Sequence, residues 1–134
     1  INTRAHLTKI LQSQELKQHK LMNNIIGIDL GTTYSVIAKL DEIGNPSVVS
    51  VDGTTLTASC VGADDPVTML VGEEAKNMVA HEPDCVVQRF KREMGNDIVY
   101  SLGSFATLTP ISASAQVLKK MVQEAEKELG PIKD

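Results

Sequence analysis

An apolar run that contains one carboxylate and leads into a Gly-Thr-Thr turn constrains this 134-residue chain more than any other stretch. The run is Ile25-Ile26-Gly27-Ile28-Asp29-Leu30, and the turn is Gly31-Thr32-Thr33. A carboxylate is rarely left inside a strand unless it is paired or lies near a metal. The residues that follow, 34–40, are rich in β-branched side chains and predict a second strand. We therefore expect a buried strand, a turn and a second strand here.

A turn of this composition can hold a phosphate group. Gly31 allows a ligand to approach the backbone closely, and the amides and hydroxyls of Thr32 and Thr33 can donate to phosphate oxygens. Asp29 can order a hydrated Mg²⁺ beside those oxygens. Two common phosphate-loop patterns, Gly-x-x-x-x-Gly-Lys-Ser/Thr and Gly-x-Gly-x-x-Gly before a helix, do not fit this stretch. The alternative is a buried hairpin in which Asp29 makes only a local turn bond.

Composition indicates one globular domain and argues against some partners. The chain is 42% hydrophobic and 22% charged, which is enough apolar material for a core. A net charge of −4 and a pI near 5.3 argue against a nucleic acid or an anionic membrane as partner. No apolar run approaches the ~20 residues that a spanning helix needs. Cys60 and Cys85 lack metal-ligand spacing, so we expect free thiols in a reducing compartment.

Charge divides the chain near Met22. Residues 1–21 carry four Lys or Arg and one Glu, a net +3, so the remainder carries −7 of the total of −4. The stretch 1–21 is Gln-rich with a weak helical stripe, and it predicts a weak helix or disorder. We expect residues 1–21 to be a non-native or upstream extension and residues 22–134 to form the domain.

Periodicity and turn residues predict a mixed α/β chain beyond the first two strands. Further strands or extended segments are expected at 47–51, 56–61, 69–71, 98–100 and 104–108, the first of them completing a β-meander. Helices are expected at 72–81, 86–95 and 112–129. Ser112 or Ser114 is the expected N-cap of the last helix. The fold class is therefore α/β, with a meander flanked by helices.

Several segments resemble one family in a single register. Residues 27–35, Gly-Ile-Asp-Leu-Gly-Thr-Thr-Tyr-Ser, closely resemble the first phosphate motif of the heat-shock 70 (DnaK-type) chaperones, whose ATPase domain is actin-like (ribonuclease H-like). Residues 90–95, Phe-Lys-Arg-Glu-Met-Gly, resemble that family's apolar-Lys-Arg-x-apolar-Gly segment. Two departures are Tyr34, where the family usually has Asn, and Ala58, where it usually has Pro. The resemblance extends from about Asn23 to Asp134.

The resemblance implies the N-terminal part of an actin-like nucleotide-binding domain that uses ATP and Mg²⁺. It implies that Asp29 orders the metal through water and that Lys91, as a catalytic residue, reaches the γ-phosphate and the attacking water. The β- and γ-phosphates would be held by Gly31, Thr32, Thr33 and Tyr34. It further implies a cytoplasmic chaperone that binds unfolded polypeptides, with a J-domain co-chaperone and a nucleotide-exchange factor as partners.

The resembled region is only the start of such a domain, so we expect this stretch alone to lack a complete active site. Three alternatives stay open at this point. Another actin-like ATPase or a sugar kinase would keep Asp29 and the Gly-Thr-Thr turn without needing residues 90–95. A truncated, non-catalytic relative would act only as a binding module. A structural α/β module would bind no ligand.

Overall fold

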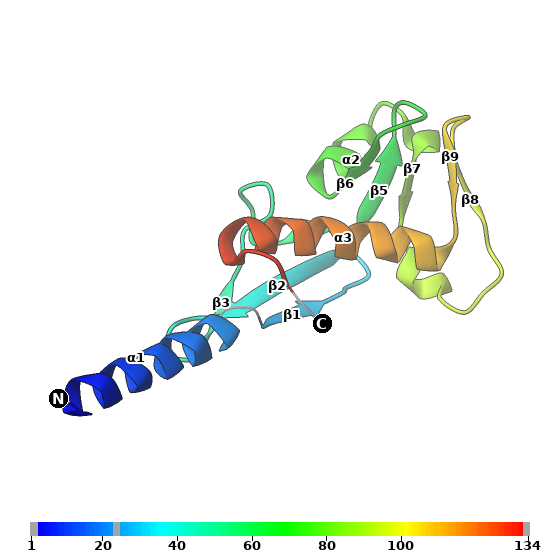
Figure 1. Cartoon of the computed structure of the whole chain (residues 1–134). Helices are drawn as coiled ribbons and strands as arrows, with labels where there is room; N and C mark the ends of the chain where they lie inside the picture. The colour runs from blue at the N-terminus through cyan, green and yellow to red at the C-terminus, as the bar shows by residue number, and fades with distance from the viewer. Residues whose placement is uncertain (1–2, 23–24, 133–134) are drawn as a thin grey trace.

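The computed structural model describes residues 3–22 and 25–132 of the chain. Asn23 and Asp134, the expected limits of the family resemblance, lie outside the described residues. The described part is a mixed α/β structure with antiparallel sheets, as predicted. Figure 1 shows the long helix α3 lying across a first sheet and reaching a second group of strands.

The first sheet is the predicted β-meander. Strands β1 (Ile26–Asp29), β2 (Tyr34–Leu40) and β3 (Pro46–Val48) follow one another with antiparallel pairing. The short strand β4 (Thr57–Ala58) also pairs with β2. The third strand was predicted to reach Val51 but ends at Val48. Val51 instead forms a bridge with Thr54, because the chain turns there.

Strand β1 is not the fully buried strand that its apolar run predicts. Ile26 and Ile28 are half-buried, whereas Gly27 and Asp29 are exposed. The physical reason is that successive side chains of a strand point to opposite faces of the sheet, and of β1 it is Ile26 and Ile28 that pack against the core. Asp29 therefore points away from the interior and needs no buried partner.

The second group of strands contains two further sheets. Strand β5 (Cys60–Ala63) lies between β6 (Met69–Val71) and β7 (Val86–Gln88), and β8 (Tyr100–Leu102) forms a hairpin with β9 (Ala106–Leu108). The expected extended segment 56–61 is thus divided between two sheets. Helix α2 (Glu73–Met78) follows β6 and ends three residues before the predicted His81.

The helix predicted for residues 86–95 does not form. Val86 and Val87 are β-branched and pair with β5, so tertiary pairing determines their conformation. Arg89 then takes a left-handed backbone conformation with φ 57°, and a short 3₁₀ helix, Phe90–Glu93, follows it. The Phe90 side chain is fully buried, which fixes this 3₁₀ helix to the core.

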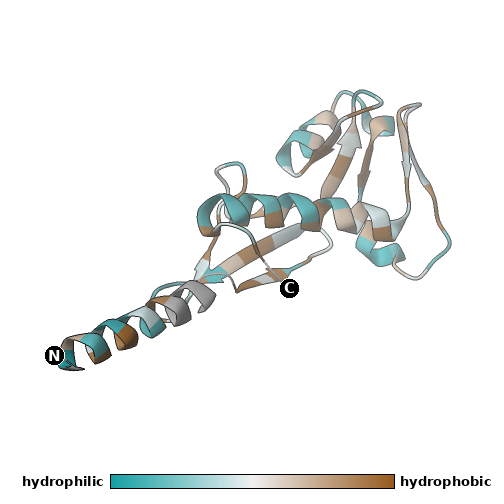
Figure 2. Ribbon diagram, viewed as in Figure 1, coloured by the Kyte–Doolittle hydropathy of each residue, from teal (hydrophilic) through white to brown (hydrophobic). Residues whose placement is uncertain are grey.

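Helix α3 (Pro110–Leu129) joins the sheets through one buried face. Ala113, Val117, Met121 and Ala125 are fully buried on that face, and they pack in one core with residues of both groups of strands. Figure 2 shows mainly hydrophilic residues on the visible side of α3 and hydrophobic residues along β2 and β5. The helix starts earlier than predicted: Thr109 is the N-cap, and Ser112 completes a capping box as its third helical residue.

Helix α1 (Thr3–Met22) extends away from the sheets in Figure 1. Its apolar side chains at Leu7, Leu11 and Leu16 are exposed. The boundary predicted at Met22 stays a prediction, because the helix itself does not show whether residues 1–21 are native. Within residues 3–22 and 25–132, no helix is long and apolar enough to cross a membrane.

Truncating a core isoleucine tests the packing under α3. Ile37→Ala removes a side chain that is 1% exposed, and we expect the free energy of unfolding to fall by about 2–5 kcal/mol. Ile111→Ala is the matched control, since Ile111 is 66% exposed and its loss should change stability by less than about 0.5 kcal/mol. Urea denaturation measures the free energy of unfolding of both variants, and equal effects would contradict the burial of Ile37 in the core.

Candidate functional site

The turn between β1 and β2 has a shape that requires glycine at position 31. A Cβ atom placed on Gly31 would lie 2.0 Å from the carbonyl oxygen of Tyr34, far inside van der Waals contact. The close approach is between two parts of the backbone, so no side-chain movement could relieve it. Gly31 therefore permits the chain to fold back on itself here, which the sequence had assigned to ligand approach alone.

A closed ring of hydrogen bonds starts and ends on Gly31. The Gly31 N–H donates to Ser35 Oγ at 3.2 Å, and Ser59 Oγ donates to the Gly31 carbonyl at 2.8 Å. Ser35 Oγ and Ser59 Oγ are 2.9 Å apart. Because the Ser59 hydroxyl hydrogen is already used on the carbonyl, Ser35 must be the donor between the two hydroxyls.

The ring supports the turn from inside the protein. Ser35 is 0% and Ser59 3% exposed, so water does not compete for these bonds. The Ser59 N–H also donates to the Thr33 carbonyl at 2.9 Å. Sequence reasoning missed both serines as supports of the turn, although Ser35 lies inside the quoted motif.

The outer side of the turn is open to solvent. Asp29, Thr33 and Tyr34 are exposed, and Thr32 is half-buried. Their accessibility is compatible with a bound phosphate or metal. Among the residues that the structure describes, no cluster of three or more His, Cys, Asp and Glu could hold a metal ion. Asp29 fits Mg²⁺ only as a lone carboxylate that water and phosphate oxygens supplement.

Lys91 reaches the same turn from a distant part of the chain. Its Nζ donates a hydrogen bond to the Leu30 carbonyl, between Asp29 and Gly31. The side chain is exposed and comes from the 3₁₀ helix that Phe90 anchors in the core. The structure therefore brings together Asp29, the Gly-Thr-Thr turn and Lys91, which sequence reasoning had selected as one site.

Tyr34 is held by a lysine that the sequence did not single out. Lys76 Nζ donates to the Tyr34 hydroxyl and lies 4.7 Å from the centre of the ring. The hydrogen bond to Tyr34, with Glu73 nearby, raises the pKa of Lys76. The backbone of Tyr34 pairs with Ala58 in β4, so β4 forms without the proline usual in the resembled family.

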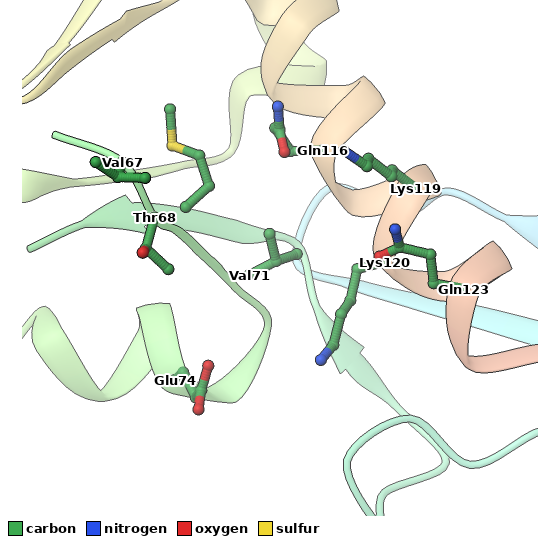
Figure 3. A pocket seen from close by; sticks show the side chains of 9 residues that line it. Val67, Thr68, Val71, Glu74, Gln116, Lys119, Lys120 and Gln123 are labelled. Carbon is green, nitrogen blue, oxygen red and sulfur yellow. The ribbon is translucent and has the colours of Figure 1, made fainter. Parts of the chain in front are cut away.

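Two pockets lie in this part of the molecule. A small one of about 60 Å³ borders the turn, between Thr32, Thr33, Tyr34, Lys76 and Arg89. A larger one of about 460 Å³ lies between β6, α2 and α3. Figure 3 shows the larger pocket, where Lys120 and Glu74 come from facing elements. The larger pocket shares no lining residue with the turn.

The Cys60 thiol lies behind the turn and has low reactivity. It is 2% exposed, and burial raises its pKa from 9.0 to about 12, opposed in part by Lys76. Cys60 and Cys85 are both free thiols, as predicted. A thiol with so high a pKa is protonated at neutral pH and is a weak nucleophile.

Replacing Gly31 tests the shape of the turn. Gly31→Ala should lower the free energy of unfolding by more than about 2 kcal/mol, because the new methyl group overlaps the Tyr34 carbonyl. Gly27→Ala is the matched control in the same hairpin, since nothing lies within 4 Å of a Cβ there. Thermal unfolding compares them, and an equally mild effect at Gly31 would refute the close approach.

The Cys60 thiol predicts a loss of stability at alkaline pH. The pKa of Cys60 is higher in the folded than in the unfolded chain. The protonated thiol therefore makes its full contribution to the free energy of unfolding below about pH 9, and this contribution is lost as the pH rises towards 12. Urea midpoints at pH 8 to 10.5 should fall more steeply for the wild type than for Cys60→Ala. Parallel slopes would show that the thiol titrates normally.

Comparisons with known proteins identify the family. The family model described as Hsp70 protein matches residues 25–104, more than half of the chain. The chaperone protein DnaK of Thermotoga neapolitana and that of Thermotoga maritima are each 37% identical over 107 residues, which are 79% of this chain and 18% of each relative. DnaK of Halobacterium salinarum has the same identity over 107 residues and 17% of its length is covered. The chain thus spans less than a fifth of these curated relatives, and it belongs to the Hsp70 family.

Proposed function

We propose that this chain is the N-terminal part of an ATP-dependent Hsp70 chaperone, within a nucleotide-binding domain of the actin-like fold. The observation that carries the proposal is the contact between Lys91 and the Leu30 carbonyl. The two residues are 61 positions apart, yet they bring the two family-like segments to one point. Such a convergence of a cation with a phosphate-type turn suits phosphoryl transfer, which depends mainly on positioning and electrostatics.

The residues of the turn would hold the phosphates of ATP. The backbone amides of Gly31, Thr32, Thr33 and Tyr34 and the two threonine hydroxyls are the donors in this proposal. The buried ring through Ser35 supports it, because a turn that is already ordered loses little freedom on binding. Asp29 would order Mg²⁺ through water, and the metal would neutralise phosphate charge when bound.

Lys91 would stabilise charge near the γ-phosphate and orient the attacking water. Its ammonium already lies beside the turn, and its exposed position leaves it free to exchange the Leu30 carbonyl for a phosphate oxygen. Such an exchange trades a neutral acceptor for a charged one, and charge-assisted hydrogen bonds are roughly twice as strong. Arg92 is exposed beside it.

The whole protein would couple ATP hydrolysis to the binding of unfolded polypeptides in the cytoplasm. The relatives carry the name chaperone protein DnaK, which supports this proposal at the level of the family. A J-domain co-chaperone and a nucleotide-exchange factor are the expected protein partners. These 134 residues, tested alone, are expected to lack ATPase activity.

Replacing Lys91 tests the proposal in the longest native protein that contains this chain. Lys91→Ala should lower ATP turnover by about 10²–10³-fold, the usual cost of removing one transition-state donor. The Kd for Mg-ATP should change little, because the backbone donors remain. Single-turnover hydrolysis and calorimetry measure the two quantities separately.

Lys119→Ala is the control for this experiment, because Lys119 is also an exposed lysine and lies on α3 away from the turn. Its turnover should equal that of the wild type. Unchanged turnover in Lys91→Ala would remove Lys91 from the mechanism. Absence of Mg-ATP binding in the wild-type protein would instead reject the nucleotide site as a whole.

A further inference from the structure

Met94 lies between the 3₁₀ helix that carries Lys91 and the first turn of helix α3. Of the four methionines whose side chains the structure describes, Met94 alone is exposed, with 44% of its surface accessible. Met69 and Met78 are half-buried, and Met121 is fully buried. Among these four, Met94 is therefore the one that a dissolved oxidant reaches most readily.

The 3₁₀ helix, Phe90–Glu93, is held at both of its ends. Phe90 is fully buried at the first end. At the other end, the Met94 N–H donates to the Lys91 carbonyl at 3.3 Å, and the Met94 side chain contacts α3. Hydrogen bonds in 3₁₀ helices have poorer geometry than those in α-helices, so a helix this short depends on its side-chain anchors.

Met94 contacts α3 through a buried hydroxyl. Ser114 is 4% exposed, and its Oγ lies 3.6 Å from Met94 Sδ. The same hydroxyl donates to the Pro110 carbonyl at 2.8 Å, within the first turn of α3. A serine has one hydroxyl hydrogen, and the shorter bond uses it. The Met94 sulfur therefore faces a donor that is already occupied.

Oxidation of the Met94 sulfur would change this contact. A sulfur lone pair attacks hydrogen peroxide, an S–O bond forms, and the O–O bond breaks. The leaving hydroxide takes up the remaining peroxide proton, so the products are methionine sulfoxide and water. Sulfur loses two electrons and the peroxide gains them. The polar sulfoxide either takes the Ser114 hydrogen from the Pro110 carbonyl or turns away from α3, and in both cases the original anchor is lost.

We propose that Met94 is an oxidation site for peroxide, and that its sulfoxide releases Lys91 from the turn between β1 and β2. Met94 is a positioning residue here, because it acts through the helix that places the Lys91 ammonium at the Leu30 carbonyl. The effect on ATP hydrolysis rests on the proposed function of Lys91. The oxidation and the movement of Lys91 do not rest on it, and they are tested separately.

The first measurement is site-resolved mass spectrometry of this chain during treatment with hydrogen peroxide. Met94 should be oxidised before Met69 and Met78, and Met121 should be oxidised last. Circular dichroism shows whether the chain stays folded during the treatment. Oxidation of Met121 as early as Met94 in the folded chain would overturn the site.

The movement of Lys91 is measured by NMR of the ¹⁵N-labelled chain. The Leu30 carbonyl and the Gly31 N–H belong to one peptide group, so loss of the bond from Lys91 should shift the Gly31 amide signal. Peroxide should cause this shift in the wild type but not in Met94→Leu, which keeps an apolar side chain of similar volume and forms no sulfoxide. An unmoved signal in the oxidised wild type, or the same shift in oxidised Lys91→Ala, would overturn the inference.

Turnover is measured in the longest native protein that contains this chain. Oxidation should lower single-turnover hydrolysis of ATP by about threefold to tenfold, less than the loss of Lys91 itself, because Phe90 still anchors the helix. The Kd for Mg-ATP should change little, and a methionine sulfoxide reductase should restore the rate. The rate of Met94→Leu should be the same before and after peroxide.

The outcomes separate this inference from the proposed function. If Lys91→Ala lowers turnover but oxidation of Met94 does not, the inference is wrong and the role of Lys91 stands. If Lys91→Ala leaves turnover unchanged, the catalytic role fails, and the Gly31 signal alone decides whether Met94 positions Lys91. A loss of rate in peroxide-treated Met94→Leu equal to that of the wild type would place the damage at another residue and overturn the inference.

Discussion

The ring of hydrogen bonds through Gly31, Ser35 and Ser59 is the interaction on which the candidate site depends. It joins the turn after β1 to Ser59, which lies between β4 and β5. Gly31 and Ser59 are 28 residues apart in the chain. The turn is thus fixed from its buried side by the segment that links the first sheet to the second group of strands. Its outer side stays open to solvent, so the same residues can be ordered and accessible at once.

The cations around the turn come from elements that the core places independently. Lys91 follows from the burial of Phe90, whereas Lys76 follows from helix α2 packing on β5 through Ala75. Arg89 directly follows β7, and its own left-handed backbone conformation places its side chain. Lys76 is therefore held by a different packing contact from Lys91 and Arg89, which flank Phe90, and a change in one of these two contacts need not move the other.

The sequence located the turn well and its supports poorly. The motif at 27–35 and the segment at 90–95 selected Asp29, Gly31 and Lys91, which the structure brings together, although their roles stay predictions. The helix predicted for 86–95 was wrong, because pairing of Val86 and Val87 with β5 outweighs local periodicity. Lys76 could not have been found from sequence, since its contact with Tyr34 depends on how α2 packs.

The direction of the hydrogen bonds in the ring has a consequence for how this sequence can change. Loss of either serine hydroxyl leaves a buried polar partner unsatisfied, which costs more than an ordinary hydrogen bond contributes. Replacing both removes the bond between the two hydroxyls and takes one partner each from the Gly31 N–H and the Gly31 carbonyl, so the effects of the two replacements are not additive. Ser35 and Ser59 are therefore energetically coupled, and substitutions tolerated at one of them depend on the residue at the other.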